Sequence, residues 1–431
     1  MSAAPAGLRL VPPPETAAGE TPAAEAATHP LNERLRGGLF ASHLLTTWAL
    51  GLSNALLGLA ILVAPLLGPV RLPAERPARR MLAMAGLYLL LLAGAIGASR
   101  AVSLSARAFS EIFSFATFGF ALVWIRGERR VRWLLDGLVL VGAFVALSGL
   151  AQVLLGYGDI ERRIRGPFSH YMTFAGTLLL IDLVLIARML LRRERRAGHG
   201  PTAWLDRPAV AWTALVVLNL ALIGSLTRSA WIALVAALAG ITALVRPRLL
   251  LWAPVVALGF LVLAPVPVVS RVLSITAVGE ASNYDRIAMA EAGARMVDER
   301  PLLGVGPDMV KHLYPLYRHP TAPRLLTPHL HNAYVQLAAE RGLPALLVYL
   351  ALVGCALVAA WNGFRDGAAA GRPGGRADLH LGVLAALVGF SIAALFENNW
   401  GDTEVQRLVL FLLAVPFCLE AGKGEAGAGT A

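Results

Sequence analysis

The sequence is dominated by apolar blocks that are each long enough to cross a lipid bilayer as a helix. A helix needs roughly 20 residues to cross the hydrocarbon core. Charged residues make up only 15% of the chain, whereas soluble domains carry about 25%. We therefore expect an all-α polytopic membrane protein. The blocks lie at 39–67, 81–98, 101–125, 133–156, 167–190, 208–226, 229–245, 249–269, 331–361, 380–397 and 404–421.

Basic residues gather in short segments between these blocks. Loops rich in Lys and Arg usually stay in the cytoplasm, so these segments predict the cytoplasmic side. They also account for the formal net charge of +11 without a nucleic-acid partner. Cys355 and Cys418 both lie in apolar blocks, so we expect neither a disulfide nor a zinc site. The basic segments are 71–80, 126–132, 192–207, 246–248 and 365–376.

The loop charges constrain how often the first block crosses the membrane. All basic segments lie on one side only if block 39–67 crosses twice, as a hairpin that turns near residues 51–54. That arrangement predicts about 12 transmembrane helices with both termini in the cytoplasm. A single crossing would leave eleven spans and place the N-terminus outside.

These considerations predict five segments. Residues 1–33, rich in Ala, Pro, Glu and Thr, are expected to form a disordered cytoplasmic tail, and they lack the pattern of a signal peptide. Residues 34–270 would hold transmembrane helices 1 to 8 when each of the eight apolar blocks is counted once, the first of them being the hairpin. Residues 271–330 would form a partly helical loop that caps the opposite face, residues 331–421 would close the bundle, and residues 422–431 would form a second disordered tail.

Histidines are the first candidates for chemistry. His331 and Asn332 open the block at 331–361, and His329 lies just before them. Imidazole titrates near neutral pH, so a histidine at the mouth of a span can take a proton from a hydroxyl nucleophile. The alternative is a histidine that only forms hydrogen bonds at a helix N-terminus.

Several arginines fall on the face opposite the basic segments, against the loop bias. Arg163 and Arg165 precede block 167–190, and Arg228 lies between two spans that almost touch in sequence. Arginine pairs with phosphate through two parallel hydrogen bonds, so arginines from separate spans would form an anion site. For Arg163, Arg165 and the adjacent Arg162, the alternatives are headgroup contacts or ion pairs with Asp159 and Glu161. For Arg286, the alternative is an ion pair within its own helix.

Carboxylates gather in the stretch 397–404, before the last block. Glu397, Asp402 or Glu404 could orient His331, as a carboxylate does for a catalytic imidazole, and we choose Asp402 as the second catalytic residue. Its alternative role is to cap the following helix. The sequence shows no metal-binding motif, so we expect metal-independent chemistry without a cofactor, with arginines supplying the positive charge.

Several of these stretches resemble the O-antigen ligase and polymerase superfamily. His331-Asn332 followed after nine residues by Gly342 resembles its histidine motif, and Arg163-x-x-Gly166-x-Phe168 resembles its arginine element. The sequence SLTRSAW around Arg228 resembles its arginine-bearing span break. The segments 285–307 and 396–404 resemble the start of its periplasmic loop and the stretch before its final span. The likeness covers the chain from about residue 150 onward.

The resemblance implies a GT-C-like glycosyltransferase in the bacterial inner membrane with its active site facing the periplasm. The donor would be a glycan on undecaprenyl pyrophosphate, and the acceptor a hydroxyl of lipid A-core. Arg163, Arg165, Arg228 and Arg286 would bind the pyrophosphate. His331 would activate the acceptor, with inversion at the anomeric carbon. We expect the remaining pair, Asn332 and His329, to position the acceptor.

Other functions are compatible with the same residues. A polysaccharide polymerase or a protein O-oligosaccharyltransferase of this superfamily would use the same donor with a glycan or protein acceptor. A transporter fits less well, because its charged or broken helices should lie at mid-membrane, whereas the polar residues here lie toward one face. A non-enzymatic scaffold would leave Arg228 and His331 without a reason for their positions.

Overall fold

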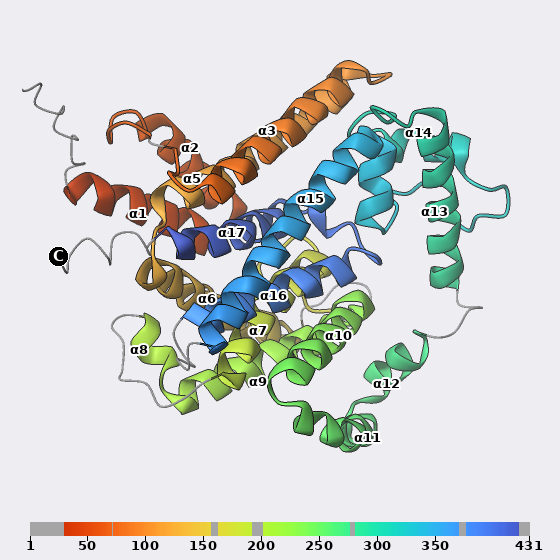
Figure 1. Ribbon diagram of the computed structural model, residues 1–431. Helices are drawn as coiled ribbons and strands as arrows, with labels where there is room; N and C mark the ends of the chain where they lie inside the picture. The colour runs from red at the N-terminus through yellow and green to blue at the C-terminus, as the bar shows by residue number, and fades with distance from the viewer. Residues whose placement is uncertain are drawn as a thin grey trace, which may run out of the picture.

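The computed structural model describes residues 30–70, 72–156, 163–191, 201–275, 281–369 and 376–421, and every regular element in these ranges is a helix (Figure 1). The predicted all-α class is therefore confirmed. The predicted tails at 1–29 and 422–431 lie outside the described residues. The helices are α1 (Pro30–Leu45), α2 (Leu50–Val63), α3 (Arg76–Gly97), α4 (Val102–Ser105), η1 (Ala106–Ala108), α5 (Phe109–Trp124), α6 (Glu128–Leu154), α7 (Tyr171–Leu190), α8 (Pro201–Leu205), α9 (Pro208–Gly224), α10 (Arg228–Val245), η2 (Pro247–Trp252), α11 (Ala253–Leu263), α12 (Val266–Leu273), α13 (Ala281–Glu299), α14 (Val310–Tyr317), α15 (Ala333–Ala369), α16 (Arg376–Ala393), η3 (Asn399–Gly401) and α17 (Thr403–Glu420).

Seven helical segments in the described part of the chain are long and apolar enough to cross a membrane. Three further apolar helices, Leu50–Val63, Pro208–Gly224 and Pro247–Leu263, are shorter. α17 is 18 residues long but contains three ionisable residues. The predicted count of about 12 spans therefore stays a prediction. The seven segments are Arg76–Gly97, Val102–Trp124, Glu128–Leu154, Tyr171–Leu190, Arg228–Val245, Ala333–Ala369 and Arg376–Ala393.

The first apolar block forms two helices that pack together, but the chain turns at residues 46–49 and not at 51–54. Polar residues in this block suggested a turn, yet Ser53 points into the bundle. Its hydroxyl lies 2.9 Å from Nδ1 of His43 and accepts a hydrogen bond of 3.0 Å from Arg407. Ser53 therefore lies within α2 and forms hydrogen bonds with buried partners on other helices, and the chain turns before α2 begins.

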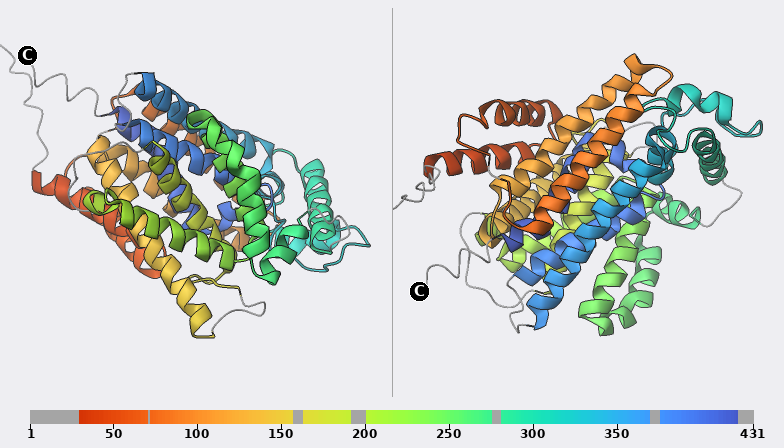
Figure 2. Two further views of the ribbon diagram at one scale, coloured as in Figure 1. Left: turned by 90° about the horizontal axis from the view of Figure 1, so that it is seen from below. Right: turned by 45° about the horizontal axis from the view of Figure 1, so that its top comes forward.

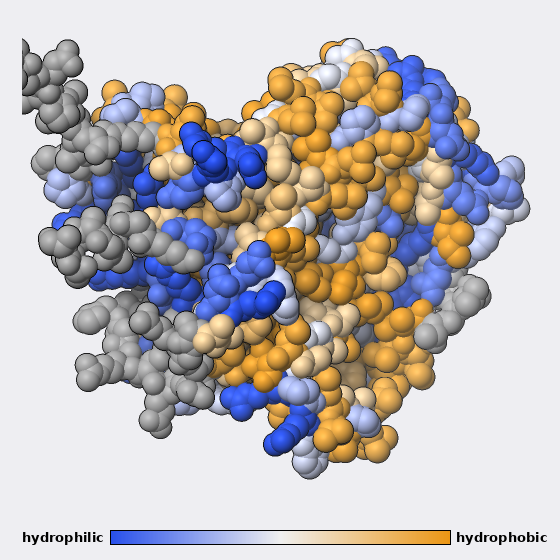
Figure 3. Space-filling model, in the orientation of Figure 1, coloured by the Kyte–Doolittle hydropathy of each residue, from blue (hydrophilic) through white to orange (hydrophobic). Residues whose placement is uncertain are grey.

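The long helices run side by side, and α7 and α16 are the most buried of the candidate spans. α16 packs against α7, α10 and α15, and α17 packs against α5 (Figure 2). An apolar band separates two polar margins of the surface in Figure 3, and the right-hand margin lies over α13 and α14. This pattern is that of a bundle embedded in lipid with a polar cap at one end.

The cap corresponds to most of the predicted loop at 271–330 and is largely helical, although its predicted first residue falls within α12. Its main helix is α13, which runs from Ala281 to Glu299. α14 contains Pro315 and ends two residues after it. The helices lie together at one end of the molecule in both views of Figure 2.

Gly342 fixes the cap to the bundle. α15 breaks at this residue, where φ is 85°, and the amide of Leu343 donates to the carbonyl of Pro301 at 2.7 Å. Two further backbone hydrogen bonds join Val305 and Gly306 to α15. A Cβ on Gly342 would lie 2.1 Å from the carbonyl oxygen of Leu302, so only glycine allows this close approach.

Candidate active site

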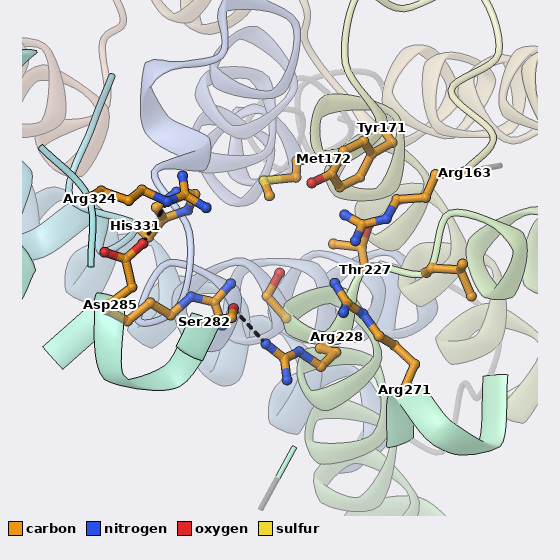
Figure 4. Close-up of a pocket in the computed structure, with 13 residues that line it drawn as sticks. Arg163, Tyr171, Met172, Thr227, Arg228, Arg271, Ser282, Asp285, Arg324 and His331 are labelled. Atoms are coloured by element: carbon orange, nitrogen blue, oxygen red, sulfur yellow. Dashed lines mark hydrogen bonds and ion pairs between the residues drawn. The ribbon is translucent and has the colours of Figure 1, made fainter. Parts of the chain in front are cut away.

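A cavity of about 360 Å³ lies between the bundle and the cap (Figure 4). It is bordered by the start of α7, the break between α9 and α10, α12, α13 and the segment that leads to α15. Five arginines and one aspartate line it, so its charge is strongly positive. The lining residues are Arg163, Tyr171, Met172, Leu226, Thr227, Arg228, Ser229, Arg271, Ser282, Asp285, Arg286, Arg324 and His331.

Arg228 enters this cavity from the short break between α9 and α10. Leu226 has a φ of 53°, so the chain turns sharply and α10 begins at Arg228. The guanidinium is only 5% exposed. It donates to the carbonyl and hydroxyl of Ser274, both at 3.0 Å, and to the hydroxyl of Ser282 at 2.9 Å. These contacts hold the charge at the cavity wall (Figure 4).

Arg163 approaches from a turn that Gln152 holds in place. The side-chain oxygen of Gln152 accepts from the amides of Arg165 and Gly166, each at 3.1 Å, and its nitrogen donates to the Gly166 carbonyl. The guanidinium of Arg163 lies 4.4 Å from the centre of the Tyr171 ring, a cation–π contact. Arg165 instead faces solvent and donates to the Ser169 carbonyl at 3.0 Å, so it does not line the cavity.

Arg286 lies in α13 and does line the cavity. Its pKa is lowered by burial, and the positive charges of Arg228 and Arg271 lower it further against the raising effect of Glu397. The predicted alternative was an ion pair within its helix, for example with Asp285. Asp285 instead pairs with Arg324 at 2.8 Å.

Sequence reasoning missed Arg271 and Arg324, which both line the cavity. Arg271 is in α12 and Arg324 in the segment between α14 and α15. A signal was present, because both belong to the predicted cap, where arginines oppose the loop bias. The sequence did not show which cap arginines would face the bundle.

His331 lies at the cavity wall in a strained backbone conformation, with a φ of 49°. Residues other than glycine seldom adopt this conformation, and such residues cluster at functional sites. Nδ1 of His331 lies 3.0 Å from Oε2 of Glu397. Burial would raise the pKa of Glu397, but the hydrogen bond and charge of His331 lower it overall. Glu397 is therefore ionised and can only accept, so Nδ1 of His331 carries the hydrogen, and whenever the ring is neutral its lone pair is on Nε2.

The orienting carboxylate is thus Glu397 and not Asp402, which was our choice among the three candidates. The peptide amide of Asn398 also donates to Glu397, which stabilises the carboxylate next to His331. Asp402 directly precedes α17, but its side chain does not cap that helix. Burial raises the pKa of Asp402 to about 7. Its side chain lines a second cavity, beside His329.

The other two predicted site residues differ in role. The side-chain oxygen of Asn332 accepts from the amides of Tyr334 and Val335, both at 3.0 Å, and its nitrogen donates to the Leu395 carbonyl. Asn332 therefore caps α15 and holds His331 in its turn. Burial lowers the pKa of His329 to about 4, so this ring is neutral at pH 7.

His329, His331 and Glu397 also form a group that could hold a metal ion. Their ligand atoms all lie within 4.8 Å of one another. The sequence indicated no metal site, because Glu397 is far from both histidines along the chain. Two imidazoles and a carboxylate are suitable ligands for zinc. Nδ1 of each histidine already faces Glu397, so a bound ion would replace the contacts between the histidines and this carboxylate.

The cavity as a whole is suited to a multiply charged anion beside a hydroxyl group. Buried guanidinium groups stabilise phosphate oxygens more strongly than exposed ones, because water does not screen them. His331 presents a basic nitrogen at the same cavity. The structure therefore brings together Arg163, Arg228, Arg286 and His331, as predicted, and leaves out Arg165 and Asp402.

Comparison with known families agrees with this geometry. Residues 212–350 match the family model described as O-antigen ligase. The match begins in α9 and includes Arg228, the cap, His331 and the break at Gly342. A search among curated proteins gave no match. The chain is thus a helical protein with several helices long and apolar enough to cross a membrane, and its residues 212–350 are similar to the O-antigen ligase family.

Proposed function

We propose that the protein transfers a glycan from undecaprenyl pyrophosphate to a hydroxyl of lipid A-core on the periplasmic face of the inner membrane. The observation that carries the proposal is a cavity lined by five arginines and by a histidine whose Nδ1 meets a buried carboxylate. A pyrophosphate diester and a sugar hydroxyl are the chemical groups that such a cavity fits. The orientation follows from the basic segments at the opposite end of the bundle.

The arginines would bind the donor and stabilise the leaving group. Bond cleavage at the anomeric carbon leaves negative charge on the pyrophosphate. Arg163, Arg228 and Arg286 would neutralise that negative charge. Arg271 and Arg324 would contribute further positive charge. Preorganised positive groups at a developing charge typically contribute a factor of about 10² to 10³ each.

His331 would act as the general base. Nε2 takes the proton of the acceptor hydroxyl while its oxygen forms a bond to the anomeric carbon and the bond to the pyrophosphate oxygen breaks. Attack opposite the leaving group inverts the anomeric configuration. Glu397 stabilises the imidazolium that results. General-base catalysis contributes about 10² to 10⁴.

The proposal can be tested in a deletion strain by complementation with variants. We expect His331→Ala and Arg228→Ala to abolish long-chain lipopolysaccharide on a gel, with lipid-linked polymer accumulating and protein levels unchanged. Arg295→Ala, an exposed arginine that lines neither cavity, should restore the ladder. A core with a single repeat in the deletion strain would instead indicate a polymerase. An unchanged ladder in the deletion strain would refute the proposal.

A further inference from the structure

We propose that a second cavity, of about 260 Å³, is the site that binds the sugar ring of the acceptor. This inference rests on the proposed function and specifies its acceptor side. The cavity lies next to the arginine-lined cavity, and the two share the cluster at Glu397. His329 lines the second cavity and His331 the first, and their ring centres are 4.3 Å apart. A molecule in the second cavity is therefore adjacent to the base.

The second cavity differs from the first in charge. Its lining contains two arginines and four carboxyl groups, from Glu111, Asp308, Glu340 and Asp402. The first contains five arginines and one aspartate. A pyrophosphate is attracted to the first cavity and repelled from the second, so the two cavities separate donor from acceptor.

The lining groups match the chemistry of a sugar. Each sugar hydroxyl both donates and accepts, so its binding site needs donors and acceptors together. Asp402, Gln336, Asn398 and Thr403 provide amide, carboxyl and hydroxyl groups, and Trp400 provides an aromatic surface. Small-molecule sites usually measure roughly 300–1,000 Å³, so this cavity is suited to a single ring.

The floor of the cavity is rigid because its polar groups bind one another. Arg341 pairs with Glu111 at 2.6 Å. The other oxygen of Glu111 accepts from the indole nitrogen of Trp400 at 2.9 Å and from the side chain of Gln406 at 3.2 Å. These hydrogen bonds hold Glu111, Trp400 and Gln406 in place, and they engage both oxygens of Glu111.

The rim of the cavity holds groups that can bind a ligand. Arg107 is exposed in η1, and within the described part of the chain no hydrogen bond or ion pair involves its side chain. Asp402 also lines the cavity and directly precedes α17. Ser110 and Pro328 are exposed at the same rim, so the cavity opens to the outside. Arg107 and Asp402 are the residues we expect to contact the acceptor ring.

Kinetics with the purified full-length protein distinguish this role from donor binding. The probes are a synthetic polyprenyl-pyrophosphate-linked glycan and lipopolysaccharide that carries core but no long chain. We expect Arg107→Ala and Asp402→Asn each to raise the KM for the core acceptor by about tenfold, which is the effect expected from the loss of one charged hydrogen bond. The KM for the donor should stay within about twofold. Arg228→Ala should show the reverse pattern, and Arg295→Ala should change neither.

The possible results of this experiment distinguish a failure of this inference from a failure of the proposed function on which it rests. If the wild-type protein transfers glycan and both rim variants keep the acceptor KM of the wild type, the cavity does not bind the acceptor. If the rim variants change the donor KM instead, the cavity binds the donor and the inference is wrong. If the wild-type protein transfers no glycan from this donor, the proposed function itself fails. Arg107→Ala serves where Asp402→Asn fails to fold, because Arg107 is exposed.

Discussion

The contact between Glu397 and His331 predicts a specific kinetic defect. Glu397→Gln keeps the shape of the side chain but replaces an ionised acceptor with a neutral amide that can also donate. The amide can then present its nitrogen to Nδ1 of His331 and favour the wrong tautomer. The 3.0 Å contact is a charged hydrogen bond, and such bonds contribute about 1.5–3 kcal/mol.

This energy sets the size of the expected effect. At about 1.4 kcal/mol for each factor of ten, the loss corresponds to a decrease in kcat of about 10- to 100-fold. The donor KM should stay within about twofold, because Glu397 does not line the arginine cavity. His331→Ala should lower kcat further, by about 10² to 10⁴.

The assay is the initial rate of glycan transfer by purified protein at saturating donor and acceptor. Glu397→Asp is the matched control, because it keeps the charge and shortens the side chain by one methylene group. It should lose less activity than Glu397→Gln. If Glu397→Gln retains wild-type kcat within about twofold, Glu397 does not orient the base and the interpretation of this cluster is wrong.

Three further predictions follow from the structure. Gly342→Ala should lower the stability of the purified protein by roughly 3 kcal/mol or more, because φ is 85° and the new Cβ would clash with Leu302. The effect should be measured as a lower thermal midpoint. Gly354→Ala is the control and should not lower it, because nothing lies within 4 Å of a Cβ at that position. Asp402 should contribute a loss of stability of at most about 4 kcal/mol as pH rises from about 4 to 7, because its folded pKa is about 7 and its ordinary value 3.8, so the wild-type protein should lose more stability over this range than Asp402→Asn loses. EDTA should leave transfer unchanged, and a loss that added zinc restores would reassign His329, His331 and Glu397 as a metal centre.

The fold class and much of the site could be predicted because each depends on a strong local signal. Long apolar blocks fold mainly as membrane-spanning helices, because lipid offers no hydrogen-bond partners to the backbone. Arg228 could be identified because placing a charge between two spans costs free energy, so a residue in such a position usually has a functional role. His331 stood out because it opens a span in a polar stretch.

The errors concern contacts between segments that are distant in the sequence. Glu397 and Asp402 are five residues apart, and only the path of the chain through η3 decides which of them meets His331. Arg165 is two residues from Arg163, yet the turn held by Gln152 directs it to solvent. Ser53 suggested a turn, but it satisfies Arg407, which is 354 residues away along the chain.

The second cavity shows the same limit. Its lining comes from η1, α5, the cap, α15, the stretch before α17 and the first turn of α17. No short motif joins these segments, so composition and spacing could not predict the cavity. The family match at 212–350 likewise leaves out Arg107, Glu397 and Asp402.

The central claim is that the arginine cavity and His331 together transfer a glycan from a lipid pyrophosphate. The most direct measurement is mass spectrometry of the products that purified protein forms in nanodiscs from a polyprenyl-pyrophosphate-linked glycan and core lipopolysaccharide, together with the anomeric configuration of the new bond by NMR. The account predicts an extended core with inverted configuration and free polyprenyl pyrophosphate from the wild-type protein, and none from His331→Ala. Retained configuration, or equal transfer by His331→Ala, would contradict it.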